Sequence, residues 1–230
     1  MSPMPERRDP PPPPVLPVPM RRPMAILAGL AGIVVTVLAV HYAGTATAGP
    51  LDQRLRAGVW NLFGRARPGA LVLDLFGEPV VAALLVAALA ALCLALRRRA
   101  LAVVALVGPA LTGVATTTLK PVVGRTIHGG HLAYPSGHTA TVTALALVGM
   151  LLVASLVRSG RAVGLLLVLG GAGAAGAVMA VAQIVLDAHY PTDTVGGFAV
   201  ALAVVPATAL LVDRFAARWR WLRSPTDASR

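Results

Sequence analysis

Six long apolar runs restrict what this chain can fold into. Each is close to the roughly 20 residues that an α-helix needs to cross the hydrocarbon core of a bilayer. Hydrophobic types make up 57% of the 230 residues and charged types only 13%, so one small globule cannot bury the apolar surface. The sequence therefore predicts an all-α, six-transmembrane-helix bundle with spans near 24–43, 78–96, 100–119, 138–157, 162–186 and 194–213.

Composition divides the chain into three parts. Residues 1–23 contain the proline-rich stretch DPPPPPVLPVP and are predicted to be a disordered cytoplasmic tail. Residues 24–216 form the membrane domain, and 217–230 form a basic cytoplasmic C-terminal tail. The first span has an alternative interpretation, because Arg21-Arg22, an apolar run and TATAGP also resemble a cleavable signal peptide. Cleavage would not change the orientation of the other five spans.

The distribution of basic residues orients the bundle. Six spans place both termini and the loops near 97–99 and 158–161 on one side, and that side holds fourteen of the twenty basic residues. The positive-inside rule makes it cytoplasmic. The protein is thus predicted to be a multi-pass plasma-membrane protein whose outer loops lie around 44–77, 120–137 and 187–193. The fifth span, with GGAGAAGA at 170–177, is expected to be central because small residues let helices approach closely.

A net charge of +11 does not indicate nucleic acid here. The arginines separate apolar runs and do not follow one helix face with interleaved aromatic residues. The bilayer is the predicted partner, and the sequence leaves the oligomeric state open. The single cysteine, Cys93, lies inside an apolar run and excludes a disulfide framework.

Four groups with catalytic potential are predicted at one membrane level. Lys120 ends the third span, His138 begins the fourth, and His189 and Asp193 lie in the turn between the fifth and sixth. Lys120 is the one lysine beside nineteen arginines. Single residues have simpler interpretations, since Ser136 or Asp193 can cap a helix. Their convergence nevertheless predicts an active site at the extracytoplasmic membrane interface.

These residue types suit phosphoryl transfer. A phosphate needs cations and backbone N–H groups, which Lys120 and the helix start at Ser136-Gly137 can offer. One imidazole can attack phosphorus while an aspartate orients it, and the other can protonate the leaving oxygen. No metal-ligand cluster or cofactor motif is apparent in the sequence, so a metal-independent route without a cofactor is predicted.

Three motifs resemble those of the type 2 phosphatidic acid phosphatase superfamily. They are Lys120 followed by Val123-Gly124-Arg125, then PSGH at 135–138, then HYPTD at 189–193. This superfamily includes lipid phosphate phosphatases and bacterial undecaprenyl pyrophosphate phosphatases. The resemblance implies that His138 is the general acid, that His189 is the nucleophile and that Asp193 orients His189. It also implies a phosphohistidine intermediate.

Two departures from the family pattern concern arginines that would hold phosphate. The first motif normally has an arginine seven residues after the lysine, where this chain has Ile127, and the third has one where this chain has Gln183. Arg125 is the nearest cation to the first position and is assigned to phosphate binding with Lys120, Ser136 and Gly137. Further candidates for the missing charge are Arg65, Arg67, His128 and His131.

The favoured function is a membrane phosphatase acting on a lipid phosphate or pyrophosphate of phosphatidate or polyprenyl type. A lipid phosphotransferase using the same intermediate and a non-catalytic protein of the same fold remain alternatives. An intramembrane serine protease with a Ser136–His189 dyad is a weaker alternative. It would want a small residue two positions before the serine, where Tyr134 stands.

Overall fold

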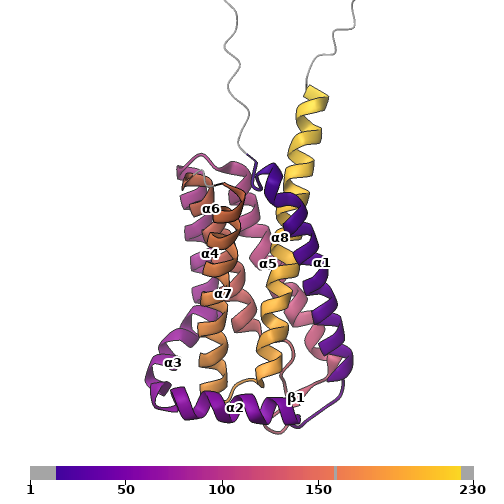
Figure 1. Ribbon diagram of the computed structural model, residues 1–230, viewed down its shortest axis with the longest axis vertical. Helices are drawn as coiled ribbons and strands as arrows, with labels where there is room; N and C mark the ends of the chain where they lie inside the picture. The colour runs from indigo at the N-terminus through magenta and orange to yellow at the C-terminus, as the bar shows by residue number, and fades with distance from the viewer. Residues whose placement is uncertain (1–13, 158–159, 224–230) are drawn as a thin grey trace, which may run out of the picture.

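The computed structural model describes residues 14–157 and 160–223, which form a bundle of helices (Figure 1). Two short 3₁₀ helices flank α3, and two short strands pair in antiparallel fashion. The elements in this part of the chain are α1 (Val18–His41), α2 (Pro50–Phe63), η1 (Gly64–Ala66), α3 (Arg67–Asp74), η2 (Leu75–Gly77), α4 (Pro79–Ala95), α5 (Arg99–Val123), β1 (Thr126–Ile127), β2 (His131–Leu132), α6 (Gly137–Val157), α7 (Arg161–Val185) and α8 (Pro191–Arg223).

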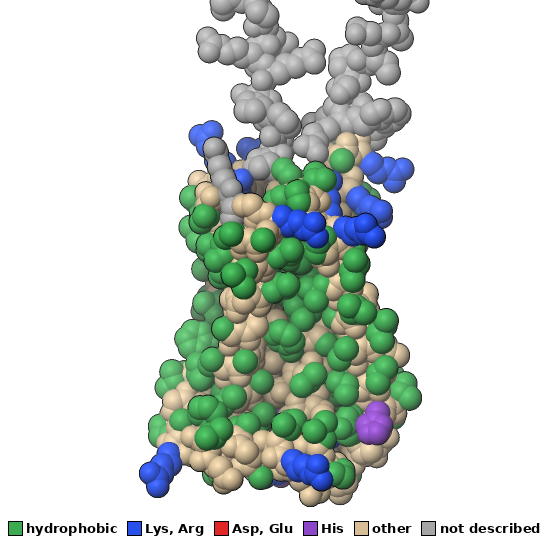
Figure 2. All heavy atoms as spheres, viewed as in Figure 1, with side chains coloured by type: hydrophobic (Ala, Val, Ile, Leu, Met, Phe, Trp, Pro, Cys, Tyr) green, Lys and Arg blue, Asp and Glu red, His purple; other side chains and the backbone are tan. Residues whose placement is uncertain are grey.

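The predicted all-α membrane bundle is confirmed. Helices α1, α5, α6, α7 and α8 are each long and apolar enough to cross a membrane. Helix α4 qualifies only together with the segment Pro50–Gly77, from which it is bent by 62°, so the described residues provide five spans, or six if this bent pair counts as one. On the face shown in Figure 2, hydrophobic side chains cover the long middle of the molecule, and basic side chains gather near its ends.

Helix α8, not α7, is the central helix. It packs along α1, α5 and α6, and a larger share of it is buried than of α7. The small residues of α7 do allow close approach, as expected. A Cβ added at Gly176 would lie 2.6 Å from Oγ1 of Thr143 on α6 and 2.5 Å from the ring of Phe198 on α8. The run of small residues at 170–177 therefore determines how tightly α7 packs against its neighbours, but it does not place α7 at the centre of the bundle.

The region 44–77, expected as an outer loop, contains α2, η1, α3 and η2. Figure 1 shows α2 lying across the lower end of the bundle, with α3 beside it. Proline occupies the first turn of both helices, where its missing N–H costs no intrahelical hydrogen bond. α2 mixes polar residues with leucines and a tryptophan, a pattern typical of a helix at a membrane surface. These helices cover the end of the bundle that carries the motifs.

The opposite end of the bundle holds both ends of the described chain (Figure 1). Asp213 of α8 accepts hydrogen bonds from the backbone N–H groups of Val15 and Leu16, at 2.8 and 3.0 Å. α1 begins at Val18, inside the predicted tail 1–23, whose residues 1–13 lie outside the described residues. α8 likewise continues to Arg223, and residues 224–230 of the predicted C-terminal tail lie outside the described part.

Candidate active site

The PSGH and HYPTD motifs are joined directly through the main chain. The N–H of Ser136 donates a hydrogen bond to the carbonyl of Asp193 at 2.9 Å. Two glycines of α8 make this approach possible. A Cβ at Gly197 would lie 2.2 Å from the Ser136 carbonyl oxygen, and one at Gly196 would lie 2.3 Å from the ring of Tyr134. The sequence TDTVGG therefore lets the start of α8 pack against the turn that begins α6.

His189 and Asp193 form the most enclosed part of the site. The His189 side chain is 9% exposed and Asp193 is fully buried, with Nδ1 of His189 3.8 Å from Oδ2 of Asp193. The same Oδ2 accepts a 2.9 Å hydrogen bond from the N–H of Tyr190, which fixes the carboxylate. Pro191 starts α8 two residues after the histidine. This tight turn holds the imidazole at the N-terminal end of a helix.

The electrostatic surroundings favour a neutral His189. Burial lowers the pKa of this imidazole below its ordinary value, whereas the negative charge of the nearby Asp193 carboxylate acts in the opposite direction. The positive charges of Lys120 and His138 lower the pKa further. A neutral imidazole at pH 7 carries the lone pair that a nucleophile requires.

His138 lies against two carboxylates that the sequence did not associate with it. Its Nε2 is 3.3 Å from Oδ1 of Asp74 and 3.5 Å from Oε1 of Glu78, which flank η2. A Cβ at Gly77 would lie 2.2 Å from the imidazole, so this glycine gives the ring its place. Nε2 is buried and has no hydrogen-bond partner among the described residues, which leaves it available to a substrate oxygen.

Gln183 belongs to the same side of the site. Its Nε2 donates a 2.7 Å hydrogen bond to Oδ1 of Asp74, the oxygen that faces His138. The position at which the family pattern has an arginine thus holds a neutral amide bound to a carboxylate. Asp74, Glu78 and His138 also place one ligand atom each within 4.8 Å of one another, a geometry that a cation could use. Sequence reasoning found no such group, because Asp74 and Glu78 lie about 60 residues before His138.

Lys120 lies near the end of α5 and faces the loop before α6. Its Nζ donates a 2.9 Å hydrogen bond to the carbonyl of Leu132, in β2. One of three ammonium donors is thereby used, and its charge acts on His189. Ser136 occupies the position of a helix cap. Its buried Oγ lies 3.4 Å from the N–H of Thr139 and 3.1 Å from the Thr139 hydroxyl, and α6 begins at Gly137.

Arg125 does not present its guanidinium to the candidate phosphate site. It is fully buried, and its Nη atoms bind Asp193 and Asp52, each at 2.6 Å. Tyr42 and Tyr190 cover the guanidinium, with ring centroids 3.9 and 4.4 Å from Cζ. Both ends of the arginine fork are therefore engaged within the protein, and we do not retain the predicted phosphate-binding role.

Asp52 is the buried residue that sequence reasoning missed. It lies in the first turn of α2, where an acidic residue has a common explanation as a helix-start residue. Its actual partners, Arg125 and Thr192, are 73 and 140 residues away. No local pattern could have indicated those contacts.

The other proposed sources of positive charge have different contacts. Arg67 donates to the carbonyl of Val185 at 3.3 Å and ties α3 to the end of α7. Nε2 of His128 lies 2.8 Å from the carbonyl oxygen of Asp187. Arg65 and His131 are on the surface. The structure thus gives these residues no visible role beside the two catalytic candidates.

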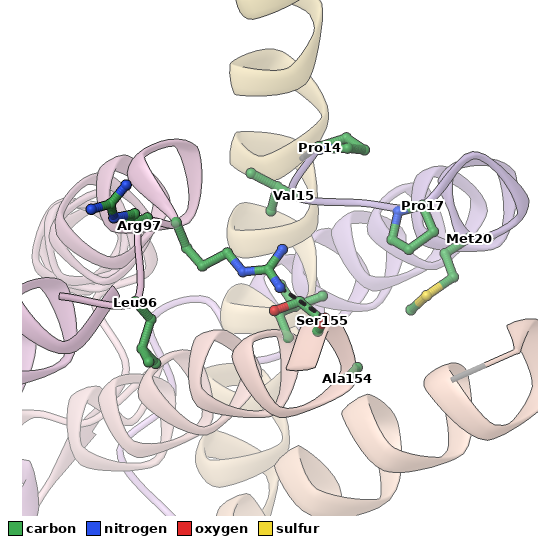
Figure 3. Close-up of a pocket in the computed structure, with 10 residues that line it drawn as sticks. Pro14, Val15, Pro17, Met20, Leu96, Arg97, Ala154 and Ser155 are labelled. Atoms are coloured by element: carbon green, nitrogen blue, oxygen red, sulfur yellow. Dashed lines mark hydrogen bonds between the residues drawn. The ribbon is translucent and has the colours of Figure 1, made fainter. Parts of the chain in front are cut away.

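A separate cavity of about 590 Å³ lies at the opposite end of the bundle (Figure 3). Arg98 lines it and donates a 3.1 Å hydrogen bond to the carbonyl of Ser155. Among the described residues, its lining has no histidine or carboxylate, so this part of the chain does not place there the groups that the motifs bring together at the other end. The residues around it are Pro14, Val15, Pro17, Met20, Leu96, Arg97, Arg98, Leu151, Ala154 and Ser155.

Comparison with known proteins agrees with the assembled site. The family model described as the PAP2 superfamily matches residues 114–217, which run from α5 to α8 and contain Lys120, His138 and His189. No significant match was found among curated proteins or among solved structures. This match confirms the predicted resemblance, and residues 114–217 of the chain are similar to the PAP2 superfamily.

Proposed function

We propose that this protein is an integral membrane phosphatase that hydrolyses a lipid phosphate or pyrophosphate through a phosphohistidine on His189. One observation carries the proposal: two histidines with different surroundings meet at one end of an apolar bundle. His189 is enclosed with Asp193, whereas His138 is more exposed and lies against Asp74 and Glu78. The match of residues 114–217 to the PAP2 superfamily model supports phosphoric ester hydrolysis as the general reaction.

The first step transfers the phosphoryl group to His189. Because Nδ1 faces Asp193, Nε2 is the atom that attacks phosphorus. The new N–P bond forms as the bond between phosphorus and the leaving oxygen breaks, and His138 gives its proton to that oxygen. Asp193 stabilises the positive charge that develops on the His189 ring.

The second step returns both histidines to their starting states. Neutral His138 accepts a proton from water as the water oxygen attacks phosphorus. The N–P bond breaks, inorganic phosphate leaves, and His189 regains its lone pair. The enzyme gains and loses no proton over the full cycle.

The phosphate charge is held by groups at the ends of two helices. Lys120 supplies an ammonium with donors left after its bond to Leu132. The first N–H groups of α6, from Gly137 onward, have no intrahelical acceptor and favour an anion. Ser136 shapes this helix start through its cap and need not contact phosphate itself.

A lipid tail would find apolar surface beside the site. A groove of about 340 Å³ lies between α3 and α7, and its lining includes Phe63, Leu73, Val181 and Ala182. Ala182 is next to Gln183, whose amide binds Asp74. A phosphorylated lipid lying in this groove would have its head group at the motif-bearing end of the bundle.

We infer that the end of the bundle that carries the motifs lies outside the cytoplasm. Figure 2 shows basic side chains gathered near the upper end, which carries both ends of the described chain. By the positive-inside rule, that end faces the cytoplasm of a plasma membrane. The substrate head group is then an extracytoplasmic one.

The test is phosphate release by the purified protein in lipid nanodiscs, over phosphatidate, a polyprenyl pyrophosphate, a polyprenyl phosphate and a soluble aryl phosphate. Each assay is paired with His189→Ala. We expect release from at least one lipid substrate, a lower rate with the soluble ester, and no release with the variant. A folded wild-type protein that releases phosphate from none of them would overturn the proposal and favour a non-catalytic role. Transfer to an added alcohol in place of water would favour a phosphotransferase.

A further inference from the structure

A buried chain of charges links the surface helix α2 to the turn that carries His189. Asp52, Arg125 and Asp193 have fully buried side chains. Nη2 of Arg125 is 2.6 Å from Oδ2 of Asp52, and Nη1 is 2.6 Å from Oδ1 of Asp193. The guanidinium between two tyrosine rings has little freedom to turn away from this alignment.

Asp52 also binds the start of α8 directly. Its Oδ1 accepts hydrogen bonds from the N–H and the hydroxyl of Thr192, at 2.9 and 2.8 Å. The Thr192 hydroxyl in turn accepts a 2.7 Å hydrogen bond from Nη1 of Arg125. Asp52 therefore holds the residue between Pro191 and Asp193 in the HYPTD turn.

The charges in this chain do not cancel. Two carboxylates share one guanidinium, which leaves a net charge of −1 that the imidazolium of His189 can balance. If Asp52 were neutral, Arg125 would balance Asp193 alone. The turn would then offer His189 no net negative charge at the moment when its ring becomes cationic.

We propose that Asp52 is a positioning residue for the candidate phosphoryl transfer, one that fixes Asp193 through Arg125 and Thr192 and leaves Asp193 its charge for His189. This inference rests on the proposed function of His189. It gives α2 a positioning role in the reaction, although α2 lies before residues 114–217, which the family model matches. Lys120, His138 and Asp193 are the charged groups that shift the pKa of His189.

The central variant is Asp52→Asn, which keeps the shape of the side chain and removes its charge. We expect kcat to fall by about tenfold or more while KM changes by less than about threefold, because the loss acts on the charged transition state. The acid limb of the pH profile of kcat/KM should move to lower pH, since the His189 imidazolium loses a stabilising charge. Asp52→Glu should recover part of the lost kcat.

The matched control is Asp213→Asn. Asp213 is also a buried carboxylate that binds an arginine and two backbone N–H groups, but it lies at the opposite end of the bundle. Its loss should lower the thermal midpoint without moving the pH profile. If both variants lose activity in proportion to stability and keep the wild-type profile, Asp52 is merely structural and the proposal fails.

A direct titration separates this inference from the proposed function. ¹⁵N-histidine NMR in nanodiscs measures the His189 midpoint without turnover, and that midpoint should fall in Asp52→Asn. It should return toward the wild-type value in Asp52→Asn with Arg125→Gln, which restores the net charge of −1. An unchanged midpoint in Asp52→Asn overturns the charge argument even if the enzyme is active. A protein without phosphatase activity that shows these shifts contradicts the proposed function and leaves the coupling intact.

Discussion

Gln183 donates a 2.7 Å hydrogen bond to Asp74, and the accepting oxygen lies 3.3 Å from Nε2 of His138. The sequence alone presents Gln183 as a lost phosphate-binding arginine. The structure gives it a partner, so the position is adapted to a nearby carboxylate. This relationship changes what an arginine at that position should do.

Gln183→Arg should not raise kcat/KM, because the new guanidinium would bind Asp74. A charge-assisted hydrogen bond contributes about 1.5–3 kcal/mol, which makes Asp74 a strong competitor for the arginine. Adding Asp74→Asn should free the arginine for phosphate and lower KM relative to Gln183→Arg alone. Steady-state kinetics on the wild type, Gln183→Arg and the double variant test this. A tenfold gain from Gln183→Arg by itself would show that the arginine reaches the substrate despite Asp74.

The pH dependence of kcat/KM should reflect the lowered pKa of His189. Burial lowers its pKa, and a nucleophile must be neutral, so the acid limb of kcat/KM should lie below the ordinary histidine value of about 6.5. The free energy of unfolding should also decrease at acid pH. The unfolded chain binds the proton more readily than the native state, so stability falls as pH decreases through about 6.5 toward the native pKa. An acid limb clearly above 6.5 would contradict a neutral, enclosed His189.

Activity should persist in a chelator and fall when Zn²⁺ is added. Asp74, Glu78 and His138 have the spacing of a cation site, but a bound cation would occupy Nε2 of His138. The general acid would then lack the atom that carries its proton. The test measures the rate of phosphate release in EDTA and then, without EDTA, at increasing Zn²⁺ concentrations. Glu78→Gln is the control and should weaken inhibition by zinc. A requirement for metal would remove the acid role from His138.

The loop between β1 and β2 should be accessible from outside the cell. His131 is exposed in β2, and Cys93 is buried, so His131→Cys in a Cys93→Ala background gives one accessible thiol. Gly130 is less suitable because its φ of 125° disfavours a side chain. Intact cells should react with an impermeant maleimide. Labelling that requires permeabilised cells would reverse the orientation.

The sequence was sufficient for the features that depend on local composition. Run length and apolarity predicted the helices from α4 to α8, and the regular alternation of spans and turns predicted that Lys120, His138 and His189 share one end. The amphipathic helix α2 was missed because its apolar residues are interrupted by charges and do not form a run.

The sequence was insufficient where a charge is defined by a distant partner. Arg125 looks available in the sequence, yet Asp52 and Asp193 enclose it. His138 looks free of carboxylates, yet the bend between η2 and α4 brings Asp74 and Glu78 to it. Both contacts depend on how α2 to α4 fold across the end of the bundle. Carboxylates therefore lie near both histidines, and greater burial distinguishes His189 from His138.

The phosphorylated intermediate is the most direct test of the account. Rapid quench with ³²P-labelled substrate should trap an acid-labile, base-stable phosphoenzyme in the wild type and in His138→Ala. His138→Ala should retain more activity on p-nitrophenyl phosphate than on a lipid ester, because p-nitrophenol needs little protonation to leave. His189→Ala should form no phosphoenzyme on either substrate. A phosphoenzyme that persists in His189→Ala, or that maps to Ser136, would contradict the central claim.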